Sequence, residues 1–303
     1  MPRISDESLN AVVFLYASDD DADAGTKFGG TGFLVGVPMT KEGWDGWGHF
    51  YAVSNRHVAQ GTPTGFPVIR LNRMIKGVGT LPMTVNDWVP HHEADLAVCP
   101  IPGFISDQFR VQAFSTEMFI TQQHLDKRDV GIGDDCWMLG RYVDMDGGTE
   151  SNSPAVRFGN LAKAQPEIVK DLATGIRQES FLVEVRSLSG FSGSPVLVNQ
   201  GAKTYPISDG TEHFQVGPTN QDLLLGIDWG HHPWVAGVYR GARSRNEREP
   251  TDLWTEHNSG MMNVVPAWKI QELLDDDELR HMRDSEEEDL PDEPPVAHEA
   301  IPA

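Results

Sequence analysis

The sequence predicts an all-β fold for most of its 303 residues. Short apolar segments rich in Val, Ile, Phe and Trp alternate with clusters of Gly, Pro, Asn and Asp, the usual pattern of strands and turns. Few stretches space their apolar residues at helical intervals. So many short strands in one body favour a barrel or a pair of barrels. The predicted strands are Ala11–Tyr16, Gly32–Val37, Phe50–Ser54, Val68–Leu71, Leu96–Pro100, Cys136–Arg141, Ala155–Ala164, Phe181–Val185, Pro195–Asn199, Leu223–Asp228, Ala236–Tyr239 and Met261–Pro266.

Gly-rich and polar segments between these strands predict loops or hairpin tips. They are Gly25–Gly30, Met39–Gly48, Tyr205–Thr219 and the polar segment Gly241–Ser259.

One helix is predicted at Ala267–Arg280, where Trp268 and Leu273 belong to an apolar side and Pro266 stands near the start. Beyond Arg283 the chain is acidic and contains several prolines, with too little apolar content to pack. We therefore expect residues 284–303 to form a disordered acidic tail.

The charge balance narrows the classes of partner. The chain has 45 acidic and 24 basic residues, a formal net charge of −21, which argues against binding a nucleic-acid backbone or an anionic membrane. No apolar run reaches the length of a membrane span, and the start of the chain does not resemble a secretory signal, so a cytoplasmic location is expected. Cys99 and Cys136 stand in apolar, strand-like runs, which predicts buried free thiols in a reducing compartment.

The stretch RSLSGFSGSPVLV, Arg186–Val198, crowds serines, glycines and a proline in front of an apolar run. Its composition alone predicts a turn. It equally fits a nucleophile loop, in which Gly190 allows close approach to a substrate and the N–H groups of Gly190 and Ser192 converge on one point.

A nucleophilic serine needs a base and a group that orients the base, and both have candidates near strand ends. In FYAVSNRHVAQG, His57 follows a predicted strand. In HHEADLAVCPI, Asp95 precedes a buried run, where an unpaired carboxylate would suffer a desolvation penalty. An imidazole N–H is a suitable partner for that carboxylate.

In the order His57, Asp95, Ser192, these segments resemble the chymotrypsin-like (trypsin-like) serine peptidase family. AVSNRHVA resembles its histidine motif, ADLAVCPI its aspartate motif and SGFSGSPV its nucleophile motif. GGTGFLVG resembles its opening strand, and GIGDDCWMLGR the first strand of its second barrel. The resemblance covers roughly Ala11 to Leu274.

The resemblance implies a peptidase domain over residues 1–283 with two six-stranded β-barrels, about 11–115 and 130–266, and a C-terminal helix at 267–280. It also implies that Ser192 attacks a peptide carbonyl, with His57 as general base and Asp95 as orienter. The N–H groups of Gly190 and Ser192 would form the oxyanion hole. The expected partner is a protein or peptide substrate, and no cofactor or metal is needed.

Substrate specificity is harder to predict. Arg186 stands six residues before Ser192, where the family has the base of its primary pocket, and an arginine there would favour an acidic or polar side chain before the scissile bond. Alternatively, Arg186 is a surface residue on the same face as Glu184, or is neutralised by Asp228. LLGIDWGHHPWVAGVYR resembles the strand that lines the family's cleft, which predicts substrate contacts at Asp228, Trp229 and Gly230.

Phe191 occupies the place of the aspartate that pairs with a new N-terminus in secreted digestive members. Its presence predicts activity without N-terminal processing.

Two other readings remain open. A trypsin-like fold with intact motifs can act as a catalytically silent binding module. A metal enzyme would draw ligands from the aspartates and from His91, His92, Glu93, His213, His231 and His232. However, adjacent histidines on a strand point in different directions, and HExxH or CxxC spacing is lacking. The sequence leaves the oligomeric state open.

Overall fold

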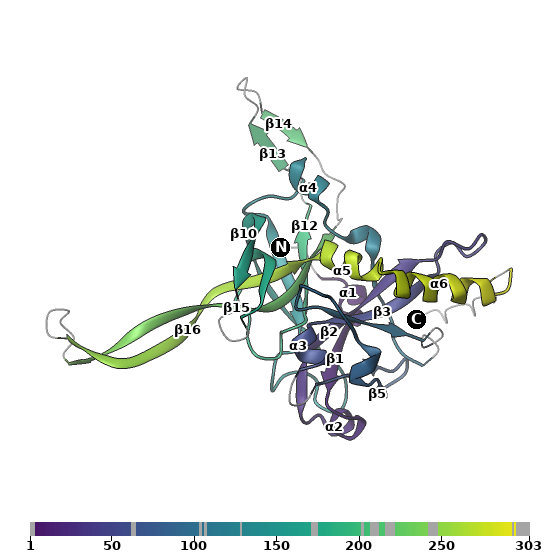
Figure 1. Ribbon diagram of the computed structural model, residues 1–303, viewed down its shortest axis with the longest axis horizontal. Helices are drawn as coiled ribbons and strands as arrows, with labels where there is room; N and C mark the ends of the chain where they lie inside the picture. Colours follow the sequence, from purple (N-terminus) through teal and green to yellow (C-terminus); the bar gives the residue numbers. More distant parts are fainter. Residues whose placement is uncertain are drawn as a thin grey trace.

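The computed structural model describes residues 4–61, 65–102, 105, 108–127, 129–170, 175–200, 203–206, 212–215, 222–241, 248–292 and 294. At 203–206, 212–215, 241 and 248–250 it describes the backbone alone. The fold is all-β, as predicted, with an N-terminal sheet, a C-terminal barrel and a few short helices (Figure 1).

The N-terminal sheet contains eight strands in the order β5-β4-β1-β2-β3-β7-β6, with β8 pairing in parallel beside β2. A six-stranded barrel was predicted here. The prediction missed β5, β6 and β8, which span two to four residues and are too short to show an alternating pattern. Among the described strands the two ends of the path, β5 and β6, do not pair with each other. The strands are β1 (Val12–Tyr16), β2 (Phe28–Pro38), β3 (Gly48–Ser54), β4 (Val68–Asn72), β5 (Val78–Leu81), β6 (Val89–Pro90), β7 (Ala97–Ile101) and β8 (Phe114–Ser115).

The C-terminal body is a closed barrel of six strands in the order β10-β11-β16-β15-β12-β9. A separate two-stranded hairpin, β13 with β14, falls at the predicted loop Tyr205–Thr219, whose residues 207–211 and 216–219 lie outside the described residues. The strands are β9 (Asp135–Gly140), β10 (Ala155–Lys170), β11 (Arg177–Glu184), β12 (Pro195–Asn199), β13 (Lys203–Pro206), β14 (Glu212–Gln215), β15 (Asp222–Gly241) and β16 (Arg248–Pro266).

β15 and β16 continue beyond the barrel as a long two-stranded ribbon (Figure 1). Their pairing reaches from Gly226↔Pro266 to Gly241↔Arg248. We call residues 231–241 and 248–260 the arm. The predicted polar loop Gly241–Ser259 is therefore wrong from Arg248 onward, because an exposed ribbon has no consistently buried face for an alternating pattern to report.

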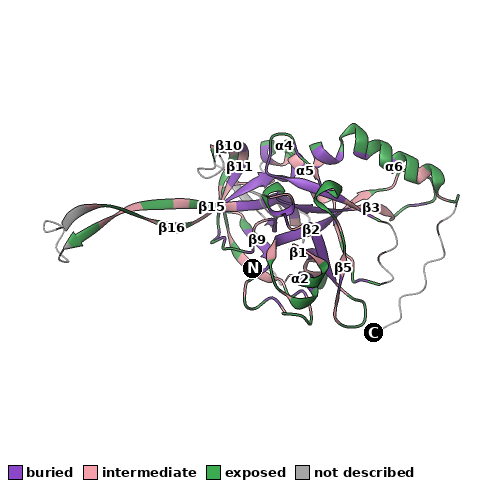
Figure 2. Cartoon of the chain, turned by 60° about the horizontal axis from the view of Figure 1, so that its bottom comes forward, coloured by how far each residue is buried: buried purple, intermediate pink, exposed green. Residues whose placement is uncertain are grey.

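Two clusters of buried residues form the core. In β1, Val13 and Leu15 belong to a cluster inside the N-terminal sheet, whereas Phe14 and Tyr16 belong to the larger cluster shared with the barrel. Alternate side chains of a strand point to opposite faces, so β1 is buried on both. Figure 2 shows burial concentrated in the strands of the two bodies, with the arm and α6 largely exposed or intermediate. Cys99 and Cys136 are buried and do not form a disulfide, as predicted.

The predicted C-terminal helix is divided into α5 (Ala267–Leu274) and α6 (Asp277–Asp289). The expectation of disorder from residue 284 is wrong through Asp289, which ends α6. Polar contacts, rather than apolar ones, hold this segment: the two ring nitrogens of His49 lie 3.0 Å from carboxylate oxygens of Glu286 and Glu287. Arg283 donates to the hydroxyl of Tyr51 at 3.0 Å.

The remaining helices are short and surround the sheets. None of the helices in the described part of the chain combines the length and apolarity needed to cross a bilayer. They are α1 (Asp6–Asn10), α2 (Asp19–Ala24), α3 (Arg56–Ala59), α4 (Gln122–Asp126) and the 3₁₀ turns η1 (Val85–Asp87) and η3 (Thr116–Met118).

Candidate active site

His57 and Asp95 meet because the strands that precede and follow them are neighbours. β3 and β7 pair antiparallel with Ser54 opposite Ala97, so His57, in α3 just after β3, and Asp95, just before β7, emerge at the same end. His57 Nδ1 lies 2.5 Å from Asp95 Oδ2, and the backbone N–H of His57 donates to Asp95 Oδ1 at 2.9 Å. One carboxylate thus fixes both the ring and the backbone of the histidine.

The surroundings of Asp95 differ from those of His57. The Asp95 side chain is 7% exposed and the His57 side chain 44%. Asn55 donates from Nδ2 to the Asp95 carbonyl at 3.0 Å, and the Asp95 N–H donates to Oε1 of Gln178 at 2.6 Å. Asn55 stands within the histidine motif, whereas Gln178, on β11 of the barrel, carried no signal in the sequence. The backbone of Asp95, which carries the buried carboxylate, is therefore held from both bodies.

Ser192 lies in the adjoining loop, and the N–H of Thr31 on β2 donates to its carbonyl at 2.9 Å. Gly30 lies close to this carbonyl and to the side chain of Val58, the residue after His57. A Cβ added at Gly30 would lie 2.5 Å from the Ser192 oxygen and 3.2 Å from the Val58 methyl groups. The absence of a side chain at Gly30 thus lets the loop of Ser192 approach α3.

Gly193 holds the other side of the loop, with a φ of +89° that favours glycine. Its N–H donates to the Asp228 carbonyl at 2.9 Å, and the Asp228 N–H donates to the Ser194 carbonyl at 2.9 Å. Ser192 is consequently held between β2 on one side and β15 on the other.

The backbone around Ser192 forms a turn, in which the Phe191 N–H donates to the Leu188 carbonyl at 3.0 Å and Gly190 has a φ of +96°. Thr31 Oγ1 donates to the Gly190 carbonyl at 2.7 Å. Within the part of the chain that the structure describes, the N–H groups of Gly190 and Ser192 donate no hydrogen bond. Phe191 is fully buried and packs edge-to-face on Tyr142, which anchors the turn in the barrel.

Asp228 is a second buried carboxyl group beside this loop. Ser187 Oγ donates to its Oδ2 at 2.6 Å, and the Gly230 N–H donates to its Oδ1 at 3.0 Å. Burial raises the pKa of Asp228 from an ordinary 3.8 to about 7, while the hydrogen bonds from Ser187 and Gly230 and the charge of His57 act in the opposite direction. Asp228 therefore changes charge near neutral pH within the field of His57.

The other predicted substrate-binding residues differ from one another in exposure to solvent. Trp229 is buried and donates from Nε1 to Ser180 Oγ at 2.9 Å. Gly230 is partly exposed. Arg186 is exposed and, with Glu184 and Gly260, borders an open depression of about 530 Å³. The structure places Ser187, not Arg186, against Asp228.

The histidine pairs considered as metal ligands have other contacts. The His91 and His92 rings are stacked, and His91 Nδ1 accepts the N–H groups of Glu93 and Ala94. His231 stands on β15, with its Nε2 3.7 Å from a carboxylate oxygen of Glu256. Among the described residues, no three His, Cys, Asp or Glu side chains converge as a metal site would require. The side chain of His213 lies outside that part.

No protein-family model matches the chain, and no curated protein matches it. Among solved structures, the chain is similar to the Rv3671c protease in an inactive form, with 13% identity, a TM-score of 0.44 and 88% of each chain covered. It is also similar to an inactive mutant of Rv3671c from M. tuberculosis H37Rv, with 12% identity and a TM-score of 0.43. That similarity covers 88% of this chain and 86% of the mutant's chain. Both of these similar structures are proteases.

Proposed function

We propose that the chain is a serine endopeptidase in which His57, Asp95 and Ser192 form the catalytic triad. The observation that carries this proposal is the pair of hydrogen bonds that the Asp95 carboxylate accepts from the ring and backbone of His57, beside a serine loop in which, among the described residues, the N–H groups of Gly190 and Ser192 donate no hydrogen bond. A structural ion pair would account for the first feature. It would not account for the second.

In the proposed reaction, Ser192 Oγ attacks the carbonyl carbon of a peptide bond as His57 Nε2 accepts the hydroxyl proton. Asp95 holds the ring in the required tautomer and stabilises its positive charge. The carbonyl oxygen, now negative, accepts hydrogen bonds from the N–H groups of Gly190 and Ser192, each of which contributes on the order of 3 kcal/mol to transition-state stabilisation.

The cycle then closes by hydrolysis. His57 gives its proton to the leaving amine, the peptide bond breaks, and an ester remains between the acyl group and Ser192. Water, deprotonated by His57, attacks this ester and releases the acid, which restores the serine hydroxyl. The proposed substrate is a polypeptide, whose chain near the scissile bond contacts the partly exposed Gly230, whereas the buried Asp228 and Trp229 support that strand from within.

Labelling with a fluorophosphonate probe, which phosphonylates an activated serine, tests the proposal on purified full-length protein. Wild type should be labelled, and Ser192→Ala and His57→Ala should lose the label. Ser189→Ala is the matched control, because it removes an exposed hydroxyl from the same loop and should leave labelling intact. A folded wild-type protein that takes no label would refute the proposal and favour a binding module.

A further inference from the structure

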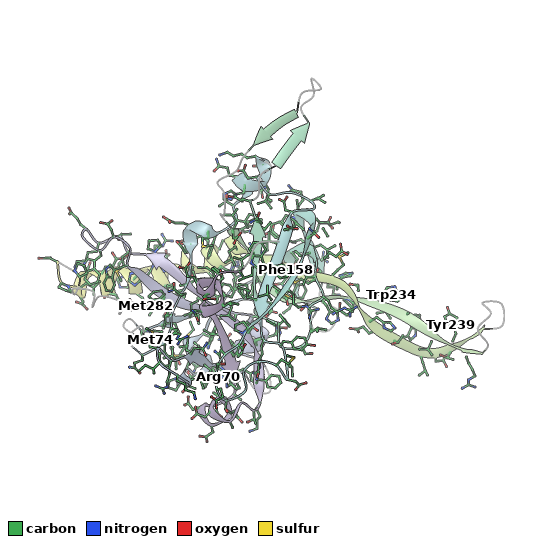
Figure 3. The ribbon with its side chains drawn as sticks, turned by 180° about the vertical axis from the view of Figure 1, so that it is seen from behind. Arg70, Met74, Phe158, Trp234, Tyr239 and Met282 are labelled. Atoms are coloured by element: carbon green, nitrogen blue, oxygen red, sulfur yellow. The ribbon has the colours of Figure 1, made fainter. Side chains whose placement is uncertain are left out.

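The arm carries large apolar side chains in contact with solvent. Trp234 is 61% exposed, Tyr239 58% and Trp254 71%, and Val235 and Leu253 are also exposed. Figure 3 shows Trp234 and Tyr239 along the arm, beyond the body that contains Met74. Single exposed apolar residues are normal on a protein surface, but a contiguous group indicates an interaction site.

These side chains lie on both faces of the ribbon. Gly237 stands opposite Trp254, and a Cβ added at Gly237 would meet the rings of Trp254 and Tyr239. This face therefore carries Tyr239 and Trp254, together with Val235, two residues before Gly237. Trp234, which pairs with His257, lies on the other face. A two-stranded ribbon is marginally stable alone in water, and apolar groups on both faces point to a partner that contacts both.

The arm is continuous with the candidate active site. β15 passes from Asp228, whose backbone holds the loop of Ser192, into the arm without a break. Its pairing with β12 ends at Ile227, and beyond that residue the described ladders of β15 involve β16 alone. Among the described residues, one edge of β15 is thus not paired with another strand from Gly230 to the end of the arm. The twelve residues from Gly230 to Gly241 are separated by eleven steps, which span about 36 Å at the rise of an extended strand.

We propose that this edge is an extended substrate-binding surface, on which an unfolded polypeptide segment with alternating apolar side chains adds as a further strand. The inference rests on the proposed function and names the class of its substrate. An added strand directs successive side chains to opposite faces of the sheet, which explains why both faces of the arm carry exposed apolar groups. The net charge of −21 favours neutral or basic segments over acidic ones.

A second copy of the chain fits the arm less well. Two identical arms joined edge to edge would both present Pro233, which lacks an N–H, and both irregularities of register, at His231/Pro233 and Gly237/Tyr239. A single substrate segment paired with one arm would meet Pro233 and each irregularity of register only once. Two copies that each carry −21 also repel each other.

The experiment compares a small probe with a long substrate. The arm variant combines Trp234→Ala, Tyr239→Ala and Trp254→Ala, and the control combines Met74→Ala and Ile75→Ala, two exposed residues of the body. The fluorophosphonate labelling rate reports the catalytic groups alone. We expect it to be the same in all three proteins. For reduced, carbamidomethylated lysozyme, a basic unfolded polypeptide, kcat/KM should fall at least tenfold in the arm variant, mainly through KM, and stay unchanged in the control.

Binding gives a readout that does not depend on catalysis. In a Ser192→Ala background, fluorescence anisotropy with the same labelled polypeptide should show a Kd at least tenfold weaker when the arm substitutions are present. Equal binding with and without them would overturn the inference. So would light scattering that shows a wild-type dimer which the arm substitutions convert to a monomer. Loss of labelling in folded wild type, with arm-dependent binding intact, would refute the proposed peptidase and leave the polypeptide-binding arm.

Discussion

Replacement of Gly193 by alanine tests whether close contact with β2 positions the nucleophile loop. At Gly193 the added Cβ would lie 1.9 Å from the Thr31 carbonyl oxygen and 2.6 Å from Ser54 Oγ. Gly46→Ala is the matched control, because Gly46 has a φ of +83° but no atom within 4 Å of an added Cβ. The two variants share the backbone strain, and only Gly193→Ala adds a collision.

The expected cost follows from these contacts. The left-handed backbone conformation costs an alanine about 1 kcal/mol at either position. Relief of the collision at Gly193 requires a shift of about 1 Å between the loop and β2, since Cβ contacts under 3.0 Å are essentially never seen. Such a shift breaks the Thr31–Ser192 and Gly193–Asp228 backbone hydrogen bonds, each worth about 1 kcal/mol. Gly193→Ala should therefore lose roughly 3 kcal/mol, against about 1 kcal/mol for Gly46→Ala.

Urea unfolding measures the free energies, and the fluorophosphonate labelling rate measures the geometry of the loop. We expect Gly193→Ala to label at least a hundredfold more slowly than wild type under conditions in which it remains folded, and Gly46→Ala to label at the wild-type rate. Equal losses of stability in the two variants, with labelling preserved in both, would show that contact between Gly193 and β2 does not position Ser192.

Three further outcomes follow from buried groups. The folded pKa of Asp228, about 7, lies above its ordinary 3.8, so the folded state binds this proton more tightly and the unfolding free energy falls as pH rises from about 4 to 7. Asp228→Asn should remove up to about 4 kcal/mol of that fall, as measured by urea unfolding at pH 4 to 8. Wild-type and variant curves of unfolding free energy against pH that run parallel would contradict this prediction. Burial raises the pKa of Cys99 to about 12, so iodoacetamide at pH 8 should modify it only after unfolding; rapid alkylation of native protein would refute this. Arg283→Met removes hydrogen bonds to Tyr51 and the Leu274 carbonyl, and should speed amide exchange in α6 without changing the labelling rate; unchanged exchange would show that Arg283 does not hold the helix.

The sequence predicted elements well where a buried face constrained them. The strands at Ala11–Tyr16, Phe50–Ser54 and Pro195–Asn199 are present within a residue or two of their predicted bounds, because nearly all of their residues are buried. The pairing of His57 with Asp95 was predictable for a related reason. A carboxylate beside a buried strand must find a partner, and a histidine follows the end of the neighbouring strand by three residues.

The sequence was least informative where exposed or long-range polar contacts determine the structure. β16 is exposed over most of the arm, so its residues showed no burial pattern. Only the part of α6 from residue 284 onward was expected to be disordered, because its carboxylates find partners, including His49, that lie more than 230 residues earlier. The role of Gln178 depends on contact between the barrel and Asp95, and no local pattern encodes that contact.

Thr31 explains how a site divided between two bodies obtains a defined geometry. Its hydroxyl accepts the N–H of Arg141 at 2.9 Å and donates to the Gly190 carbonyl, while its backbone N–H binds the Ser192 carbonyl. Its own carbonyl accepts from Ser54 Oγ at 2.8 Å, three residues before His57. Buried polar groups left unpaired are costly, so a relative displacement of sheet and barrel would break several of these bonds at once. Apolar packing between the two bodies tolerates small displacements, and this directional set of bonds does not. The separation of the proposed nucleophile from its proposed base is therefore determined chiefly by the polar contacts of one residue on β2.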